Sequence, residues 1–358
     1  MKKLRTGSKA EAGLKNNLIT LAIVVVFFAV AEILVSAGVL GSLFEGLLIP
    51  MCYYIIMAIS LNLIVGILGE LSLGHGGFMC VGAYVGAVFS VLMKSAIPNA
   101  GLRYALALIL GGLAAGLIGV LIAIPILRLQ GDYLAIVTLA FGEIIYKIIQ
   151  NCYLVSDKNG LHFSFAKPID ASNLDLTSKK DILNGAMAMN GVPRSATVIS
   201  SLILVVITLI VIFNVIDSRS GRAFKAIRDN RIAAESIGVH ITKYKLTAFF
   251  ISSFFAGIAG VIYAHSNALS ANKFNYNMSI LILVFVVLGG LGNIRGSIIA
   301  TMILYALPEI LRGFQAYRML LYAIILIVMM ILNNNEKCKA FFSGIWKKRS
   351  GKKKEDAR

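Results

Sequence analysis

Long apolar stretches alternate with short polar ones along most of the chain. A helix that crosses the hydrocarbon core of a bilayer needs about 20 predominantly apolar residues. Stretches near this length recur throughout the sequence, and the two that flank Gly292 are short. They cover residues 18–40, 43–66, 71–93, 104–127, 133–155, 195–216, 246–265, 278–291, 294–311 and 317–332. The pattern predicts an all-α polytopic membrane protein, with about ten transmembrane helices in one domain over residues 18–332.

The composition excludes a soluble globular domain. Hydrophobic residues make up 58% of the 358 residues, charged residues only 14%, and the mean hydropathy is +0.83. Soluble domains, by comparison, are about one-quarter charged. The first apolar stretch is longer than the roughly 7–15 residues of a cleavable signal core. We therefore expect this stretch to be retained as a helix.

The distribution of basic residues tests the number of spans independently. With ten crossings and a cytosolic N-terminus, 23 of the 34 Lys and Arg residues fall in segments assigned to the cytosol, as the positive-inside rule requires. Both basic tails, residues 1–17 and 333–358, are then cytosolic. The net charge of +17 is explained by topology and by weak attraction to anionic membrane lipid, so we expect no nucleic-acid partner.

Two longer polar segments interrupt the apolar pattern. Residues 156–194 are mixed in charge and poor in apolar periodicity, which predicts an extracytoplasmic surface loop. Residues 217–245 are basic and predict a cytosolic loop. Within the second segment the pattern predicts one helix, which begins at the N-cap Ser220 and ends at Gly238.

One face of this predicted helix is made of small and apolar side chains: Ala223, Ile227, Ala234 and Ile237. An amphipathic helix lying on the lipid surface is one interpretation. Alanine, however, has little surface to bury in lipid, whereas small residues permit close approach by another protein. The face therefore favours docking against a protein partner.

Glycines are concentrated in a stretch that is apolar enough to span the membrane, between Gly66 and Gly86. Each glycine within a helix costs about 1 kcal/mol relative to alanine. For Gly82 and Gly86, four residues apart, close helix–helix packing explains the choice. For residues 66–77 the pattern favours a broken or re-entrant helix that lines a cavity. The candidate residues of a translocation path are Asn62, Ser72, Gly74, His75, Gly76, Gly77, Thr138 and Glu143.

Charged residues inside the apolar stretches have two interpretations. Glu143 and Lys147 are four residues apart on one helix face, which favours a structural ion pair over direct contact of Glu143 with a substrate. Glu309 and Arg312 in LPEILR are three residues apart, and they are expected to pair in the same way.

The histidine in the glycine-rich stretch also has two interpretations. His75 and Glu70 could form a proton relay or a metal-binding pair. His75 has no second histidine nearby in the sequence, however, and metal sites usually combine several such ligands. We therefore interpret His75 as a packing or hydrogen-bonding residue, and we predict no metal site.

Six motifs, taken in order, carry a resemblance to a known family. They are SLNLIVGILGELSLGHGGF, GDYLAIVTLAFGEII, SRSGRAFKAIRDN, IAAESIGV, VLGGLGNIRGS and LPEILR. Together they resemble the LivM-type permease subunit of branched-chain amino-acid ABC transporters, over about residues 60–318. The motif IAAESIGV is similar to the Glu-Ala-Ala loop of ABC importer permeases, whose short helix docks in a cleft of the cytosolic ATPase.

The resemblance implies a non-catalytic subunit of a complex in the bacterial cytoplasmic membrane. Its partners would be a homologous second permease (LivH-like), two ABC ATPase subunits and an extracytoplasmic substrate-binding protein. The chain has no GxxxxGK[ST] phosphate-binding loop, so we expect ATP and Mg on the ATPase subunits and no cofactor in this chain. The residues expected to couple to the ATPase are Gly221, Arg222, Ala223, Arg228, Ala233, Ala234, Glu235 and Gly238.

Other functions stay open at this point. An ion- or proton-coupled secondary transporter of small polar metabolites would need no ATPase-docking helix. An intramembrane enzyme would need a nucleophile and a base in the spans, and the sequence suggests none. Within the ABC class the substrate could be urea or another amino acid, because the stretch SDKNGLHFSFAK lacks the paired glycines that the family carries there.

Overall fold

The computed structural model describes residues 2–36, 42–126, 129, 131–157, 160–166, 180–185, 187, 189 and 191–334. The chain forms two compact units, Met1–Thr301 and Met302–Arg358. The tail predicted over residues 333–358 lies almost entirely outside the described residues. The first unit holds the sheet and most of the helices.

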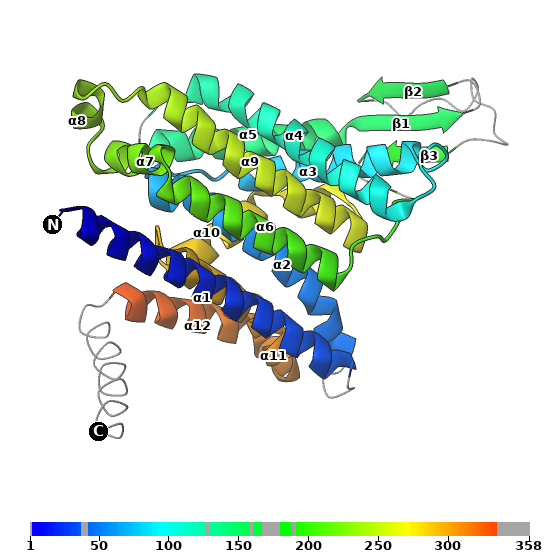
Figure 1. Ribbon diagram of the computed structural model, residues 1–358. Helices are drawn as coiled ribbons and strands as arrows, with labels where there is room; N and C mark the ends of the chain where they lie inside the picture. The colour runs from blue at the N-terminus through cyan, green and yellow to red at the C-terminus, as the bar shows by residue number, and fades with distance from the viewer. Residues whose placement is uncertain are drawn as a thin grey trace. The chain divides into compact units, whose positions relative to one another are not determined.

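The described residues are mostly helical, as the apolar pattern predicts (Figure 1). The α-helices are α1 (Lys2–Ser36), α2 (Ser42–Asn62), α3 (His75–Leu92), α4 (Ala100–Ile126), α5 (Asp132–Gln150), α6 (Val198–Asp217), α7 (Arg219–Asp229), α8 (Arg231–Ser236), α9 (Ile241–Ser266), α10 (Tyr276–Gly289), α11 (Ile294–Ile310) and α12 (Arg318–Asn334). Three shorter helices are the π-helix η1 (Leu63–Leu68) and the 3-10 helices η3 (Ala271–Phe274) and η4 (Leu311–Tyr317).

Each of the predicted apolar stretches overlaps one of these helices over most of its length. Within the described chain, seven helical segments are long and apolar enough to cross a membrane: α1, α2 with η1, α3, α4, α6, α9 and α11 with the start of η4. The other three predicted stretches correspond to α5, which carries three charged residues, and to the shorter α10 and α12. The chain is therefore an all-α polytopic membrane protein in its membrane domain.

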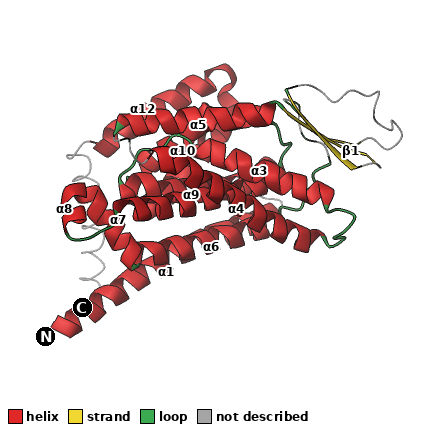
Figure 2. Cartoon of the chain, turned by 90° about the horizontal axis from the view of Figure 1, so that it is seen from above, coloured by secondary structure: helices red, strands yellow, loops and turns green. Residues whose placement is uncertain are grey.

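The segment predicted as a plain extracytoplasmic surface loop, residues 156–194, contains regular secondary structure. It contains a three-stranded antiparallel sheet of order β2-β1-β3, formed by β1 (Cys152–Asp157), β2 (Gly160–Phe165) and β3 (Lys180–Asn184). The sheet begins before residue 156, in the part assigned to a span, because α5 ends at Gln150. The sheet and the α7–α8 segment lie at opposite ends of the first unit, as Figures 1 and 2 both show.

The core of the first unit forms where α9 packs against α2, α3 and α4. Small residues make this packing possible. A Cβ on Gly82 of α3 would collide with the backbone of Gly257 in α9, and a Cβ on Gly86 would lie 2.7 Å from Cγ2 of Val261. The close helix–helix contact predicted for Gly82 and Gly86 is therefore confirmed.

We predict that Gly82→Ala destabilises the protein, because the added methyl group must separate α3 from α9. Overpacking of this kind costs about 1–3 kcal/mol, and thermal unfolding of the purified protein measures it. Gly46→Ala is the matched control, because a Cβ at Gly46 of α2 would have no heavy atom within 4 Å. Equal melting temperatures for the two variants would contradict the role assigned to Gly82.

Candidate functional site

The break that the glycine pattern predicts lies between α2 and α3. The α-helix α2 continues as the π-helix η1, which ends at Gly69 with a φ of +83°. This left-handed conformation strongly favours glycine. The chain from Gly69 to Gly74 is not helical, and α3 begins at His75. Single π-helical turns occur frequently at functional sites, so this junction is the first candidate.

Asn62, at the start of η1, is fully buried and uses its amide group twice. Its Nδ2 donates to Oγ of Ser297 over 2.8 Å, and its Oδ1 accepts from the backbone N–H of Gly292 over 2.8 Å. Gly292 belongs to the turn between α10 and α11, and a Cβ on Gly66 would collide with its backbone. The Asn62 amide therefore ties the π-helix to the α10–α11 turn.

The same π-helix is also bonded to the polar loop that follows α6. Nη1 of Arg228, in α7, donates to the carbonyl oxygen of Gly66 over 3.0 Å. The last carbonyl groups of a helix have no partner within it, and η1 ends two residues after Gly66. Asp229 accepts from Nε and Nη2 of Arg228 over 3.1 and 3.0 Å. The carboxylate of Asp229 thus holds the side chain of Arg228 while Nη1 bonds the carbonyl of Gly66 in η1.

The polar loop contains two helices rather than the single helix predicted from Ser220 to Gly238. Helix α7 begins after Ser218, whose Oγ accepts from the backbone N–H of Ser220 over 3.1 Å. The helix breaks at Asn230, which has an extended backbone, and its Oδ1 accepts from the N–H of Ala233 over 3.0 Å. Asparagine competes for helical backbone groups in this way and favours caps, which explains the break.

The predicted end of the loop helix at Gly238 is confirmed. Gly238 has a φ of +86°, and its N–H donates to the carbonyl of Glu235 over 2.9 Å while Val239 N–H donates to that of Ala234 over 3.1 Å. These two bonds form a Schellman motif, which ends many helices at glycine. The motif fixes the direction in which the chain leaves α8.

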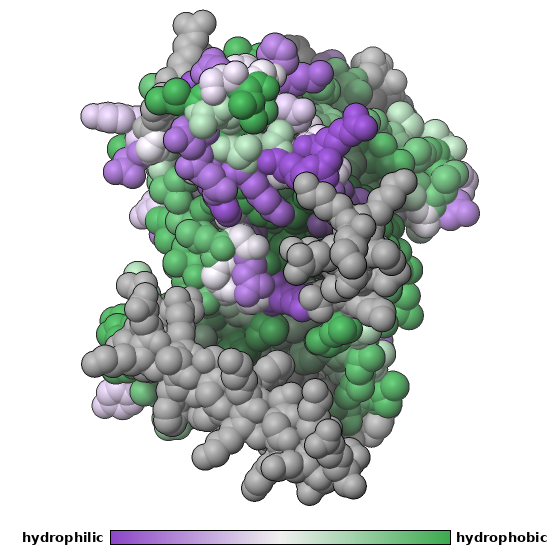
Figure 3. Space-filling model, turned by 60° about the vertical axis from the view of Figure 1, so that its left-hand side comes forward, coloured by the Kyte–Doolittle hydropathy of each residue, from purple (hydrophilic) through white to green (hydrophobic). Residues whose placement is uncertain are grey.

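Burial divides the predicted coupling residues into two groups. Gly221, Ala223 and Ala234 are buried within this chain, in α7 and α8, where Ala234 belongs to a cluster with residues of η1 and α9. Ala223, Ile227 and Ala234 of the small face therefore pack against the chain itself, which corrects the expectation that Ala223 and Ala234 face a partner, whereas Ile237 of the same face is exposed. The other predicted coupling residues are exposed: Arg222, Arg228, Ala233, Glu235 and Gly238. Ile232 of α8 and Ile237 at its C-terminal end are exposed beside them. Hydrophilic side chains gather at this end of the molecule (Figure 3).

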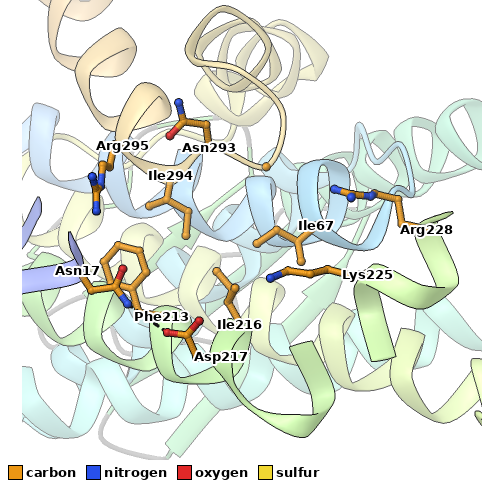
Figure 4. A pocket seen from close by; sticks show the side chains of 11 residues that line it. Asn17, Ile67, Phe213, Ile216, Asp217, Lys225, Arg228, Asn293, Ile294 and Arg295 are labelled. Atoms are coloured by element: carbon orange, nitrogen blue, oxygen red, sulfur yellow. Dashed lines mark hydrogen bonds between the residues drawn. The ribbon is translucent and has the colours of Figure 1, made fainter. Parts of the chain in front are cut away.

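A cavity of about 220 Å³ lies between α7 and the α10–α11 turn (Figure 4). Lys225, Arg228 and Arg295 give its lining a positive charge. Asp217 lies in the same wall, and its Oδ2 accepts from Nδ2 of Asn17 over 3.1 Å. Arg228 and Asn62 hold α7 and the turn, on either side of this cavity, to η1.

A buried ion pair fixes the non-helical segment after η1. Glu70 pairs with Nζ of Lys245 in α9, whose side chain is only 2% exposed. Sequence reasoning missed this pair, because the position of Lys245 in a basic loop indicates only topology. The alternative pairing of Glu70 with His75 is not formed. Instead Nε2 of His75 bonds Oγ of Ser60 over 2.9 Å.

The start of α3 is packed rather than open. Oγ1 of Thr138 accepts from Leu73 N–H over 3.0 Å, and Oγ of Ser279 accepts from Gly76 N–H over 2.9 Å. Gly74 lies against Thr138, and a Cβ on Gly77 would be 2.8 Å from the Cα of Gly142 in α5. These glycines permit close packing with α5 and α10, which corrects the prediction that they line a cavity.

Two buried polar atoms in this region have no hydrogen-bond partner among the described residues. They are Oγ of Ser72 and Nδ1 of His75. Oγ of Ser60, which bonds Nε2 of His75, also donates to the carbonyl of Met57 over 3.0 Å. In the described part of the chain no group of three His, Cys, Asp or Glu residues is placed to hold a metal ion.

The predicted ion pair within α5 is not formed. Oε1 of Glu143 accepts from the backbone N–H of Tyr276, the first residue of α10, over 2.6 Å. Lys147 donates to Oε1 of Gln150 over 3.0 Å and lies over the ring of Tyr146. The Glu143 carboxylate and the Lys147 ammonium group therefore each bond a third residue instead of each other.

The ion pair predicted within the motif LPEILR is confirmed. It lies in the second unit, where Nη1 of Arg312 is 2.9 Å from Oε1 of Glu309. The two residues are three apart, so they lie on one face of the chain, as i,i+3 neighbours in a helical segment do. The Arg312 side chain is 58% exposed, and exposed pairs of this kind contribute little to stability. The pair is therefore a local structural contact.

Comparison with known proteins identifies the family. Residues 42–332 match the family described as the permease component of branched-chain amino acid transport systems. The chain belongs to this family. The resemblance carried by the six motifs is thereby confirmed, and the match includes the α2–α3 break, the α7–α8 loop and the α10–α11 turn of this permease.

Individual relatives agree with the family. The permease is 36% identical over 287 residues to the high-affinity branched-chain amino acid transport system permease proteins LivM of Salmonella typhimurium and of Escherichia coli. It is 25% identical over 250 residues to a probable LivM permease of Methanocaldococcus jannaschii. The matches cover 78%, 78% and 68% of this chain and 66% of each relative, so the chain spans just under two thirds of their length. No solved structure matches it.

We predict that Lys245→Met destabilises this permease, because it leaves the carboxylate of Glu70 without its partner. Breaking a buried pair costs about 3–5 kcal/mol, and the 15% exposure of Glu70 places the expected loss at the lower end. The double variant Lys245→Met/Glu70→Gln removes both charges and should recover much of the loss. Thermal unfolding measures both effects, and a double variant less stable than Lys245→Met would contradict the pairing.

Proposed function

We propose that the chain is the non-catalytic permease subunit of an ATP-driven importer of branched-chain amino acids in a bacterial cytoplasmic membrane. One observation carries this proposal: the exposed α7–α8 loop is hydrogen-bonded through Arg228 to the broken membrane helix at Gly66. A docking loop bonded in this way can pass movement from a cytosolic motor to the membrane helices. The family of the chain and its relatives named as amino-acid permeases support the same proposal.

The proposed complex needs the partners that the sequence implies. The chain lacks a phosphate-binding loop of the GxxxxGK[ST] type, so two ABC ATPase subunits would supply ATP binding and Mg. A homologous LivH-like permease would complete the translocation path, and an extracytoplasmic binding protein would deliver the substrate. Urea or other amino acids are the alternative substrates within this class.

The exposed side chains of α8 are the proposed docking surface for the ATPase. Ile232 and Ile237 are 81% and 77% exposed, the highest fractions among the exposed large hydrophobic side chains of the described residues. Glu235 lies between them and is also exposed. The buried Ala234 anchors this surface to the cluster formed with η1 and α9. Force applied to α8 would therefore reach η1 through buried contacts as well as through Arg228.

We expect Ile232→Asp/Ile237→Asp to abolish copurification of the ATPase subunits and to lower amino-acid uptake at least tenfold, because charges replace the apolar contact. Leu161→Asp is the matched control: Leu161 is 56% exposed, and it lies on β2, at the opposite end of the unit. Arg228→Leu should retain the ATPases and still lower uptake, because it removes the bonds to Gly66 and Asp229 and leaves the exposed side chains of α8 in place. Copurification and uptake by proteoliposomes measure both effects.

Two outcomes would overturn the coupling model. One is full ATPase association and uptake in the Ile232→Asp/Ile237→Asp variant. The other is uptake driven by an ion gradient in proteoliposomes that contain no ATPase subunit, which would favour a secondary transporter. In either case the α7–α8 loop would not be the site through which energy enters.

The proposed orientation places both termini and the α7–α8 loop in the cytosol. We expect a cysteine at Ser236 to react with a membrane-impermeant thiol reagent only from the cytosolic side, and one at Leu161 only from the outside. The native Cys152 and Cys338 are first replaced by serine, so that the introduced thiols dominate the signal. Reaction of both positions from the same side would contradict the proposed topology.

A further inference from the structure

A second cavity, of about 380 Å³, lies on the open face of α5. Two charged side chains, Glu143 and Lys147, line it together with Asn151. Its other lining residues are Ile144 and Ile148 of α5 and Phe165 of β2. The volume falls within the range of about 300–1,000 Å³ that is typical of small-molecule sites. The cavity therefore combines both signs of charge with an apolar wall.

The charges in this cavity do not neutralise each other. Glu143 uses Oε1 to accept from Tyr276 N–H, and its second oxygen has no partner among the described residues. Lys147 donates to Gln150 and is exposed. Charged residues within membrane helices are costly and commonly mark a substrate path. A structural ion pair would explain these two residues without a ligand, but that pair is not formed.

The spacing of the charges matches the chemistry of a free amino acid. Residues four apart on a helix are neighbours, with Cβ atoms about 5–6 Å apart, so Glu143 and Lys147 present a carboxylate and an ammonium group side by side. The zwitterion of an α-amino acid carries the complementary pair, an ammonium and a carboxylate group, on one carbon atom. The apolar side chains of Ile144, Ile148 and Phe165 adjoin the charges and suit an aliphatic side chain.

We propose that this cavity is a subsite for zwitterionic amino acids with apolar side chains. The ligand's ammonium group bonds the carboxylate of Glu143, and its carboxylate bonds the ammonium group of Lys147. The inference rests on the proposed function, because it assigns the substrate class of that importer to a place in this chain. Phe165 belongs to the extracytoplasmic sheet, so the cavity lies toward the side from which the substrate enters.

A reporter cysteine tests binding directly. Ile148 lines the cavity and is 47% exposed, so Ile148→Cys should react with a thiol reagent in the assembled complex after Cys152 and Cys338 are replaced by serine. Leucine should slow this reaction at least threefold. Two analogues that each lack one charge, 3-methylbutylamine and 4-methylpentanoate, should not slow it at the same concentration.

Charge-removing variants test the two assigned contacts. Adding Lys147→Met or Glu143→Gln to the reporter should abolish the protection by leucine, and the same variants without the reporter should raise the KM for leucine uptake at least tenfold. Glutamine keeps an acceptor for Tyr276 N–H, so Glu143→Gln removes the charge with little change in structure. Lys94→Met is the matched control, because Lys94 lies in the turn after α3, away from this cavity.

The outcomes separate the subsite from the importer function. If the reporter complex without charge variants takes up leucine but leucine gives no protection, or if the charge variants are protected as well as the reporter alone, the subsite is wrong. If the wild-type complex takes up no amino acid, the proposed function is wrong. Equal protection by leucine and by both analogues would show an apolar cavity that does not recognise the zwitterion, and it would also overturn the proposal.

Discussion

The contact at Gly66 is the constraint on which the α7–α8 end of the membrane domain depends. Because Gly66 has no side chain, the backbone of Gly292 lies directly against it, and the amide of Asn62 bonds that same turn. The carbonyl of Gly66 remains available to Arg228. Three segments that are far apart in the sequence therefore meet at one residue of a π-helix. Any larger residue at position 66 would have to displace at least one of them.

The elements whose signals are local could be predicted from the sequence. The apolar stretches each overlap a helix, and Gly238 ends α8 because a left-handed residue is needed there. Gly82 and Gly86 were correctly interpreted as close-packing residues, since a spacing of four places both on one helix face. The break after η1 was also predicted, because a run of glycines weakens any helix.

The features that depend on distant partners could not be predicted. Glu70 pairs with Lys245, and Glu143 bonds Tyr276, across separations that no sequence pattern reveals. The same reason applies to Ala234. The sequence places it correctly on the small, apolar side of its helix, but only the packing against η1 and α9 shows that Ala234 is turned inward. The short strands were missed because β1 continues directly from an apolar span.

Helix α10 runs from the contact with Glu143 of α5 to the turn that Asn62 holds. Its first residue, Tyr276, donates to Glu143, and the turn after its last residue, Gly289, is held by Asn62. Its 14 residues form a single rod about 21 Å long at 1.5 Å per residue. A ligand that draws the Glu143 carboxylate toward itself competes with the end of this rod. If ligand binding changes the equilibrium between two positions of the other end by some factor, thermodynamic linkage requires that moving this end changes the affinity for the ligand by that same factor.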